Sequence, residues 1–203
     1  MISERLSLLA SLVPAAEVIV DVGAHHGHLA HAVGAIAVEA TPACVGRRDV
    51  DWVVADGLSA LRRVDVAVFA GMGARTIARL TAGGPTPSVI VAHADDDPPL
   101  LRRLLTAAGW RVDAERLADG DRRLAELIRF TPGHETASSL WLDHGPILLR
   151  SDDPLLERHL RHQHDHFTRL AATIARGRPD AAGPATTRAA FFADRLRERG
   201  WGP

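Results

Sequence analysis

Five short apolar runs in the first half of the chain constrain the fold more than any other feature of the sequence. The runs occupy residues 18–21, 35–39, 52–56, 66–70 and 88–92. Short runs of this kind are typical of strands that are buried on both faces of a parallel sheet. Segments with helical spacing lie around them, at residues 3–12, 29–33, 58–63, 74–80 and 98–108. Strands that alternate with helices predict an α/β fold, in which helices cover both faces of a parallel sheet.

The pattern changes after Trp110. Residues 111–117 and 122–130 suit two further strands, and Asp119-Gly120-Asp121 lies between them. Asp-Gly is a strong signal for the turn of a β-hairpin. We therefore expect the parallel sheet to end in an antiparallel hairpin.

The composition changes again after Gly133, and we expect one domain over residues 1–144 and a helical extension over residues 145–203. In the extension, residues 153–176 predict a long helix that Asp152 or Asp153 can cap. A break rich in Gly and Pro follows at 178–184, and residues 185–199 suit a final helix. This pattern predicts a helical hairpin without a sheet of its own.

Charge and cysteine content exclude several classes of protein. The 203 residues carry 24 basic and 25 acidic side chains, a balance that disfavours non-specific binding to DNA. A lone cysteine, Cys44, excludes an internal disulfide and a cysteine-rich zinc site. Histidines crowd residues 25–31 and 159–166, but no acid clearly completes a ligand set, so we expect no metal. No apolar run is long enough to span a membrane, and we expect a cytoplasmic protein.

One connection in the predicted sheet is unusually short. Twelve residues, 40–51, must carry the chain back to the start of a parallel strand, which is about the minimum for such a crossover. Thr41 and Pro42 can begin a helix, but Gly46 follows soon afterwards. We expect at most one or two helical turns here, and a thin wall on this side of any ligand site.

Small or acidic residues follow four successive predicted strands. The first strand enters a turn with two glycines, and the others end in an acid or a small-residue loop. The residues concerned are Asp21, Gly23 and Gly27, then Glu39, then Asp56 and Gly57, then Ala70, Gly71 and Gly73. Each turn alone could be an ordinary connection of an α/β protein. Together they lie where open α/β sheets bind ligands, at the carboxyl ends of the strands.

These motifs resemble those of the bacterial tRNA (adenine-N1)-methyltransferases that modify adenine 22. The resemblance is carried by Ser3-Glu4-Arg5-Leu6, Asp21-Val22-Gly23-Ala24-His25-His26, Gly34-Ala35-Ile36-Ala37-Val38-Glu39, Asp56-Gly57-Leu58, Ala70-Gly71-Met72-Gly73 and Gly145-Pro146. It spans nearly the whole chain, and it implies the Rossmann-like sheet of class I methyltransferases, the cofactor S-adenosylmethionine and a tRNA substrate. It also implies cofactor-binding roles for the nine small or acidic residues of the four turns, with Glu39 at the ribose and Asp56 at the adenine amino group.

The chain departs from the family on the side that holds the target base. His25 stands in place of an Asp, while the neighbouring His is kept as His26. Ala92-His93-Ala94 replaces a Gln-Pro-Asn loop after the fifth strand, and the absence of Tyr removes an aromatic available for stacking. We expect His26, His25 and His93 to take catalytic roles in placing the base. Asp95 could serve too, although Asp95-Asp96-Asp97 before Pro98 equally suits a helix cap.

The arginines of the extension are the candidate contacts for tRNA. Residues 145–203 hold 10 Arg and 7 acidic residues. The candidates are Arg150, Arg158, Arg161 and Arg169. They could equally form an ordinary solvated helix face, and the helices could instead mediate a homodimer.

The departures leave two other functions open. One is a catalytically silent homologue that binds RNA or a protein through its extension. The other is a methyltransferase for a small molecule, which the missing aromatics favour and the extension disfavours.

Overall fold

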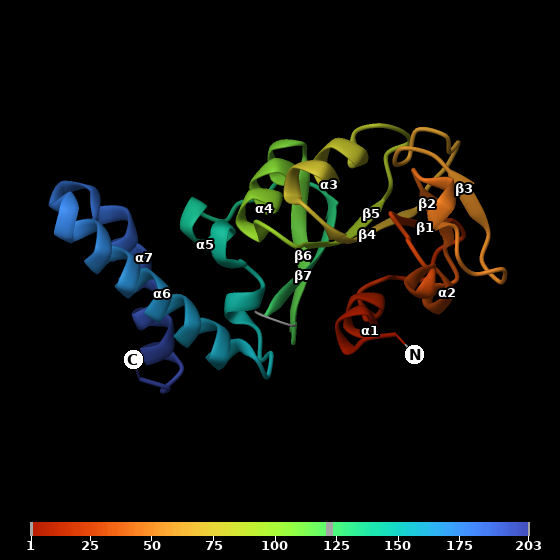
Figure 1. Cartoon of the computed structure of the whole chain (residues 1–203). Helices are drawn as coiled ribbons and strands as arrows, with labels where there is room; N and C mark the ends of the chain where they lie inside the picture. The colour runs from red at the N-terminus through yellow and green to blue at the C-terminus, as the bar shows by residue number, and fades with distance from the viewer. Residues whose placement is uncertain (1, 121–123, 203) are drawn as a thin grey trace. The chain divides into compact units, whose positions relative to one another are not determined.

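The computed structural model describes residues 2–120 and 124–202, and its chain divides into two compact units. Unit 1 is Met1–Leu148 and unit 2 is Leu149–Pro203 (Figure 1). The domain boundary expected from the sequence lies a few residues earlier, at 144/145.

Unit 1 is built on a seven-stranded sheet with the strand order β3-β2-β1-β4-β5-β7-β6. Its parallel strands are β1 (Ile19–Val22), β2 (Ile36–Glu39), β3 (Trp52–Val54), β4 (Val66–Met72) and β5 (Val89–Ala94). The antiparallel strands are β6 (Trp110–Ala118) and β7 (Ala125–Pro132). This is the predicted Rossmann-like α/β sheet with a terminal hairpin. Part of the predicted hairpin turn falls on residues 121–123, which lie outside the described residues.

Helices cover both faces of this sheet. On one face, α3 (Ala74–Thr81) and α4 (Pro98–Ala107) pack Ile77 and Leu101 against alternate strand residues such as Phe69. On the other face, α1 (Glu4–Ser11) and α2 (His28–Val33) pack Leu9 and Leu29. Residues with period-2 alternation thus supply two separate cores, which explains why the strands are continuous apolar runs in the sequence.

The helix predicted at residues 58–63 is absent, and that prediction was wrong. The segment forms turns, in which the Leu61 amide donates to the Leu58 carbonyl at 3.0 Å. Gly57 before it has a left-handed backbone, and Leu58 is fully buried. Because this buried side chain holds the segment against the core directly after a left-handed residue, the chain turns here instead of continuing as a helix.

The short crossover contains one 3-10 turn, η1 (Pro42–Cys44), as expected. Trp52 secures the rest of the crossover, since its indole Nε1 donates to the Arg47 carbonyl at 2.8 Å. The chain also passes close to the turn after β1: a Cβ added to Gly46 would lie 3.1 Å from the His26 carbonyl oxygen. The tryptophan and the glycine therefore do the packing that a helix would otherwise provide.

A buried ion cluster joins α4 to the hairpin and to the end of unit 1. Arg102 is fully buried and pairs with Glu115 of β6 and Glu126 of β7, at 2.6 and 2.7 Å. Burial alone would lower the Arg102 pKa, but the two carboxylates outweigh it and hold the pKa above its ordinary value. The other Glu115 oxygen accepts from the amides of Ile147 and Leu148, at 2.9 and 2.8 Å, beyond the short helix α5 (Ser139–His144).

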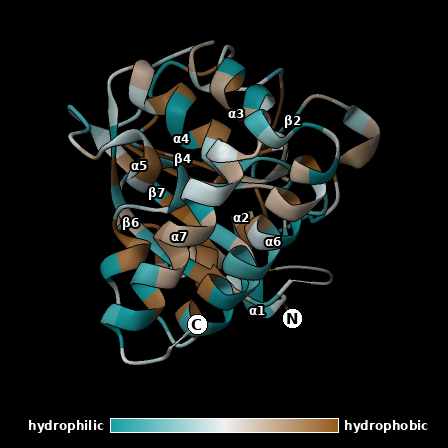
Figure 2. Cartoon of the chain, turned by 90° about the vertical axis from the view of Figure 1, so that its left-hand side faces the viewer, coloured by the Kyte–Doolittle hydropathy of each residue, from teal (hydrophilic) through white to brown (hydrophobic). Residues whose placement is uncertain are grey.

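Unit 2 is the predicted helical hairpin. Its helices are α6 (Leu156–Gly177) and α7 (Gly183–Glu198), joined by the turn η3 (Pro179–Ala181). Phe167 of α6 stacks on Phe192 of α7, with ring centroids 5.9 Å apart. Hydrophobic and hydrophilic residues alternate along both helices (Figure 2). The long helix begins later than predicted because the Asp153 carboxylate accepts from the Leu155 amide and forms a separate turn ahead of it.

None of the helices in the described part of the chain is long and apolar enough to cross a membrane.

Candidate functional site

The turns that follow β1 to β5 lie together along the carboxyl edge of the sheet, as the sequence predicted. Hydrogen bonds connect them in pairs: the Gly23 amide donates to the Val38 carbonyl at 2.8 Å, and the Asp95 amide donates to the Met72 carbonyl at 3.0 Å. The Ala55 amide likewise donates to the Glu39 carbonyl at 3.1 Å. We call this row of turns the carboxyl edge.

The turn after β1 is a run of left-handed residues. Gly23, His25 and Gly27 have φ angles of +72°, +50° and +70°. His25 is the one non-glycine with a positive φ within residues 2–120 and 124–202. Histidine tolerates this region better than most residues, which explains how it can occupy a left-handed position in this turn.

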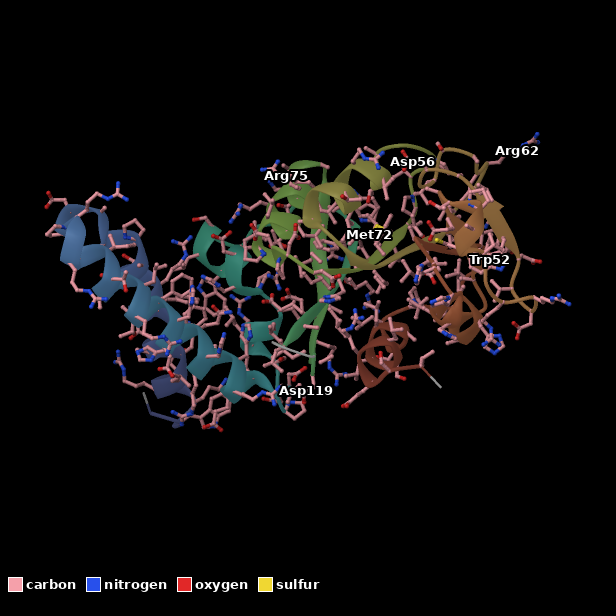
Figure 3. The ribbon with its side chains drawn as sticks, in the orientation of Figure 1. Trp52, Asp56, Arg62, Met72, Arg75 and Asp119 are labelled. Atoms are coloured by element: carbon pink, nitrogen blue, oxygen red, sulfur yellow. The ribbon has the colours of Figure 1, made fainter. Side chains whose placement is uncertain are left out.

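The two glycines are also required by close contacts. A Cβ added to Gly23 would lie 2.0 Å from Met72 Cε, and one added to Gly27 would lie 2.9 Å from Trp52 Cζ2. Figure 3 labels Met72, at the end of β4, and Trp52, on the β3 side of the sheet. Gly23 and Gly27 therefore add no side chains of their own to the turn, and the side chains of Met72 and Trp52 pack on them instead.

Asp21 lies beneath this turn and is only 2% exposed. Desolvation by burial raises the pKa of its carboxyl to about 7, the nearby Glu39 carboxylate adds to the rise, and a hydrogen bond from the Ala30 backbone opposes it. A buried acid with a pKa near neutrality at the edge of a ligand site would ionise readily beside a cation.

Glu39 faces the same turn from the end of β2. One carboxylate oxygen accepts from the His25 amide at 3.2 Å, and the other accepts from the Ala40 amide at 3.0 Å. These bonds fix the carboxylate at the junction of the first two turns, where the sequence placed a ribose-binding acid.

Asp56 has a different local partner. Its two oxygens accept from Arg79 of α3 at 2.7 and 3.1 Å, and this pair holds the pKa of Asp56 below its ordinary value. Both side chains are more than half exposed. Gly57 has a left-handed backbone, and a Cβ there would meet Leu80 at 2.8 Å. A role for Asp56 at an adenine amino group stays a prediction that needs this ion pair to open or to be shared.

Residues 70–73 bend the end of β4. The pairing with β5 shifts register between Ala70 and Met72, and Gly71 there is exposed with a φ of +80°. Gly73 is the residue before α3, and an added Cβ would lie 2.8 Å from Asp96 Oδ2. Small residues are thus required on this side of the edge as well.

The three histidines with predicted catalytic roles lie in two places. His25 and His26 are exposed on the turn after β1, with ring centroids 4.1 Å apart. His93 is buried on β5, two strands away in the sheet. Ala92-His93-Ala94 was expected in a loop, but β5 continues through Ala94, so that expectation was wrong. The extra pairing of Ala70 and Met72 with β5 lengthens the strand.

The candidate tRNA contacts all belong to unit 2. Arg150, Arg158, Arg161 and Arg169 are exposed. Arg161 bonds Glu157 at 2.8 Å and the carbonyls of Trp201 and Gly202, so its guanidinium also secures the end of the chain. No group of His, Cys, Asp and Glu among the described residues could hold a metal ion.

Met72 and Trp52 were not predicted as site residues. Met72 belongs to the Ala70-Gly71-Met72-Gly73 motif, but nothing in the sequence indicates that its side chain lies on Gly23. Trp52 could have been suspected from the short crossover, because a large side chain is the simplest way to fill the space left by a missing helix.

Comparison with known proteins decides the family. The family model of the tRNA (adenine(22)-N(1))-methyltransferases, TrmK, matches residues 17–195. The chain belongs to the TrmK family. Its enzymes methylate N1 of an adenine in tRNA, so the family assignment names both the reaction and the substrate.

Solved structures share the fold of this chain. A Streptococcus pneumoniae protein described as a candidate tRNA (m1A22) methyltransferase, in complex with S-adenosyl-L-methionine, is 21% identical, with a TM-score of 0.78 over 97% of this chain and 100% of that one. M. capricolum TrmK in complex with S-adenosyl-homocysteine is 15% identical, with a TM-score of 0.76 over 98% and 97%. The B. subtilis m1A22 tRNA methyltransferase TrmK is 19% identical, with a TM-score of 0.73 over 97% and 96%. A comparison with curated protein sequences gave no match.

Proposed function

We propose that this chain transfers the methyl group of S-adenosylmethionine to N1 of adenine 22 in tRNA. The observation that carries the proposal is the carboxyl edge, where a turn with left-handed glycines lies beside the buried Asp21 and the fixed carboxylate of Glu39. The residues fit the cofactor, because the turn joins the backbone amides of a glycine-containing loop to two carboxylates. Membership of the TrmK family supplies the target base.

The chain's own residues bind the two ends of the cofactor in this proposal. The amides of the turn at Gly23 and Gly27 face the methionine end, and Asp21 supplies a negative charge for its ammonium group. Glu39 accepts from the ribose hydroxyls, and Asp56 accepts from the adenine amino group. Gly71 and Gly73 add no side chains of their own at the end of β4.

The bound cofactor supplies an electrophilic methyl group on a sulfonium. The lone pair of adenine N1 forms the new N–C bond as the S–C bond breaks, so a neutral thioether leaves and the positive charge passes to the adenine ring. No base has to remove a proton for this step, and the task of the protein is alignment and exclusion of water.

The experiment has two stages. Isothermal titration with S-adenosylmethionine tests the carboxyl edge, and methylation of an unmodified tRNA transcript, with adenine 22 or with guanine in its place, tests the target. We expect saturable binding, and 1-methyladenosine only in the transcript with adenine 22. An absence of binding at millimolar cofactor contradicts the proposal, and binding without transfer to any tRNA would indicate the silent homologue.

Unit 2 provides a separate test of tRNA contact. Charge reversal at Arg158 and Arg169 together removes two exposed cations from α6 without touching unit 1. If these arginines meet phosphates, the affinity for tRNA falls and the salt dependence of binding becomes shallower by about two counterions. Affinity for S-adenosylmethionine remains unchanged and serves as the internal control.

A further inference from the structure

Asp95, Asp96 and Asp97 follow β5 as a run of three carboxylates, but they have different roles. Asp96 Oδ1 accepts from the amides of Ala74 and Asp97, at 2.8 and 2.6 Å, and so caps α3. Asp97 accepts from the Leu100 amide at 2.9 Å and caps α4. Asp95 is paired with a side chain instead: its Oδ1 lies 3.0 Å from Nε2 of His93. The interpretation of the run as helix caps therefore accounts for two residues and leaves one unexplained.

His93 is a buried ring that lies between two acceptors. Its Nδ1 is 3.2 Å from the Glu126 carbonyl oxygen of β7, while its Nε2 faces Asp95. The ring is held by the sheet on one side, and it directs the Asp95 carboxylate on the other. His93 cannot reach a substrate itself with both nitrogens so engaged, but it can determine where an oxygen of Asp95 lies.

The Asp95 carboxylate is directed toward the carboxyl edge. Its Oδ2 lies 3.5 Å from the place where a Cβ on Gly71 would be, and its side chain is 55% exposed. Gly71 belongs to the bend at the end of β4, and the neighbouring Met72 reaches over Gly23. A half-exposed carboxylate in a fixed orientation thus lies next to the bend of β4 and two strands away from the glycine turn.

We propose that Asp95 accepts a hydrogen bond from the N6 amino group of the target adenine, and that His93 positions Asp95 for this role. The inference rests on the proposed function. An acceptor at N6 leaves the adjacent N1 lone pair available to attack the methyl carbon. Methylation then turns a neutral base into a cation whose charge is shared with N6, and a carboxylate beside N6 stabilises that charge as it develops. An amide or a carbonyl could accept the bond but would stabilise the charge far less.

The role of Asp95 is tested by substituting Asp95 and, separately, by removing the N6 amino group from the target base. Asp95→Ala and Asp95→Asn are measured with the adenine 22 tRNA and with a tRNA that carries unsubstituted purine at position 22, which keeps N1 and lacks the amino group. We expect Asp95→Ala to lower kcat about 100-fold and Asp95→Asn about 10-fold on adenine. The wild-type enzyme should prefer adenine over purine strongly, and Asp95→Ala should lose most of that preference, since the two deletions remove the same bond.

His93 needs a readout that separates positioning from structure. His93→Leu removes the group that directs Asp95, whereas His93→Gln keeps an N–H donor at the place of Nε2. We expect His93→Leu to lower kcat with KM for S-adenosylmethionine unchanged, and His93→Gln to recover most of kcat. Equal loss in both variants at an unchanged melting temperature would contradict the positioning role.

Glu17→Gln is the matched control for charge. Glu17 precedes β1 at the opposite edge of the sheet, where it pairs with Arg63, and both side chains are largely exposed. Glu17→Gln removes one negative charge, as Asp95→Asn does, and we expect its kcat to remain within about twofold of wild type. All variants are compared by circular dichroism and by titration with S-adenosylmethionine, which should match wild type.

The outcomes distinguish this inference from the function beneath it. A wild-type enzyme that methylates neither RNA contradicts the proposed function. A wild-type enzyme that methylates adenine 22 while Asp95→Ala retains full kcat, or while Asp95→Ala still discriminates against purine, overturns the role of Asp95 and leaves the function in place.

Discussion

One side of the carboxyl edge is formed mainly by main-chain groups, and the other mainly by side chains. On the β1–β2 side, glycines with left-handed backbones and hydrogen bonds to main-chain amides create the surface. On the β5–β7 side, side chains do so: His93 directs Asp95, and Arg102 joins two glutamates in the interior. A surface made of backbone tolerates few substitutions, whereas one made of side chains can be rebuilt with other residues.

The largest effect is expected from the buried ion cluster of the side-chain half. Arg102→Met leaves Glu115 and Glu126 buried without their counter-charge, and it should lower the free energy of unfolding by about 3–5 kcal/mol. Arg79→Met is the control, because Arg79 pairs with Asp56 and both side chains are more than half exposed. Urea denaturation of both variants tests the difference. Similar losses would show that this half does not depend on its buried charges.

Gly23→Ala tests the backbone half. The new Cβ would clash with Met72 in a backbone that disfavours side chains, so either the Met72 side chain or the turn must move, and each change disturbs the place where the cofactor is proposed to bind. We expect affinity for S-adenosylmethionine to fall about 100-fold by calorimetry. Gly34→Ala is the control, since Gly34 has a φ of +65° but no heavy atom within 4 Å of an added Cβ. Adding Met72→Ala to Gly23→Ala should restore part of the affinity, and no recovery would show that Met72 is not the obstacle.

The buried carboxyl of Asp21, on the backbone half, makes the stability of the protein depend on pH. Its pKa is raised to about 7 in the folded chain, so the folded state holds a proton that the unfolded state releases above its ordinary value of 3.8. Its contribution to stability is therefore complete below about pH 4 and is lost as pH rises toward 7, at about 1.4 kcal/mol per pH unit. We expect Asp21→Asn to remove this decline in thermal or urea denaturation.

Asp65→Asn should change the pH dependence of folding stability in the opposite direction to Asp21→Asn. A hydrogen bond from the Val18 amide and the nearby Arg63 lower the pKa of Asp65, so its stabilisation is present above the unfolded value and is lost as pH falls. If both variants shifted stability in the same direction with pH, the pKa of Asp21 would not be raised by burial.

The smallest effect is expected at the Asp56–Arg79 pair. Exposed pairs contribute little, so Arg79→Ala should leave the melting temperature nearly unchanged. If Asp56 accepts a hydrogen bond from the adenine of the cofactor, Asp56→Ala lowers the affinity for S-adenosylmethionine about tenfold, whereas Arg79→Ala leaves this affinity unchanged. Equal affinities for S-adenosylmethionine in the two variants would show that Asp56 only pairs with Arg79 and that other residues recognise the adenine.

Sequence alone predicted the parts of this molecule that depend on local pattern. The five apolar runs, the hairpin and the short crossover are all present, because period, length and glycine position are properties of neighbouring residues. The helix at 58–63 was wrong because burial of Leu58, a tertiary contact, overrides the local propensity. The pairing of His93 with Asp95 could not be foreseen, since it depends on β5 continuing two residues further and on the position of Glu126 across the sheet.

The hydrogen bonds from Ile147 and Leu148 to Glu115 have a practical consequence for anyone who would express unit 1 separately. Ending a fragment at residue 144, the domain boundary expected from the sequence, removes both amide donors and leaves a buried carboxylate oxygen of Glu115 without its hydrogen bonds. Such a truncation should be poorly soluble. A stop codon placed after Leu148 instead retains the hydrogen bonds from Ile147 and Leu148 to Glu115, and the sheet is then more able to fold on its own.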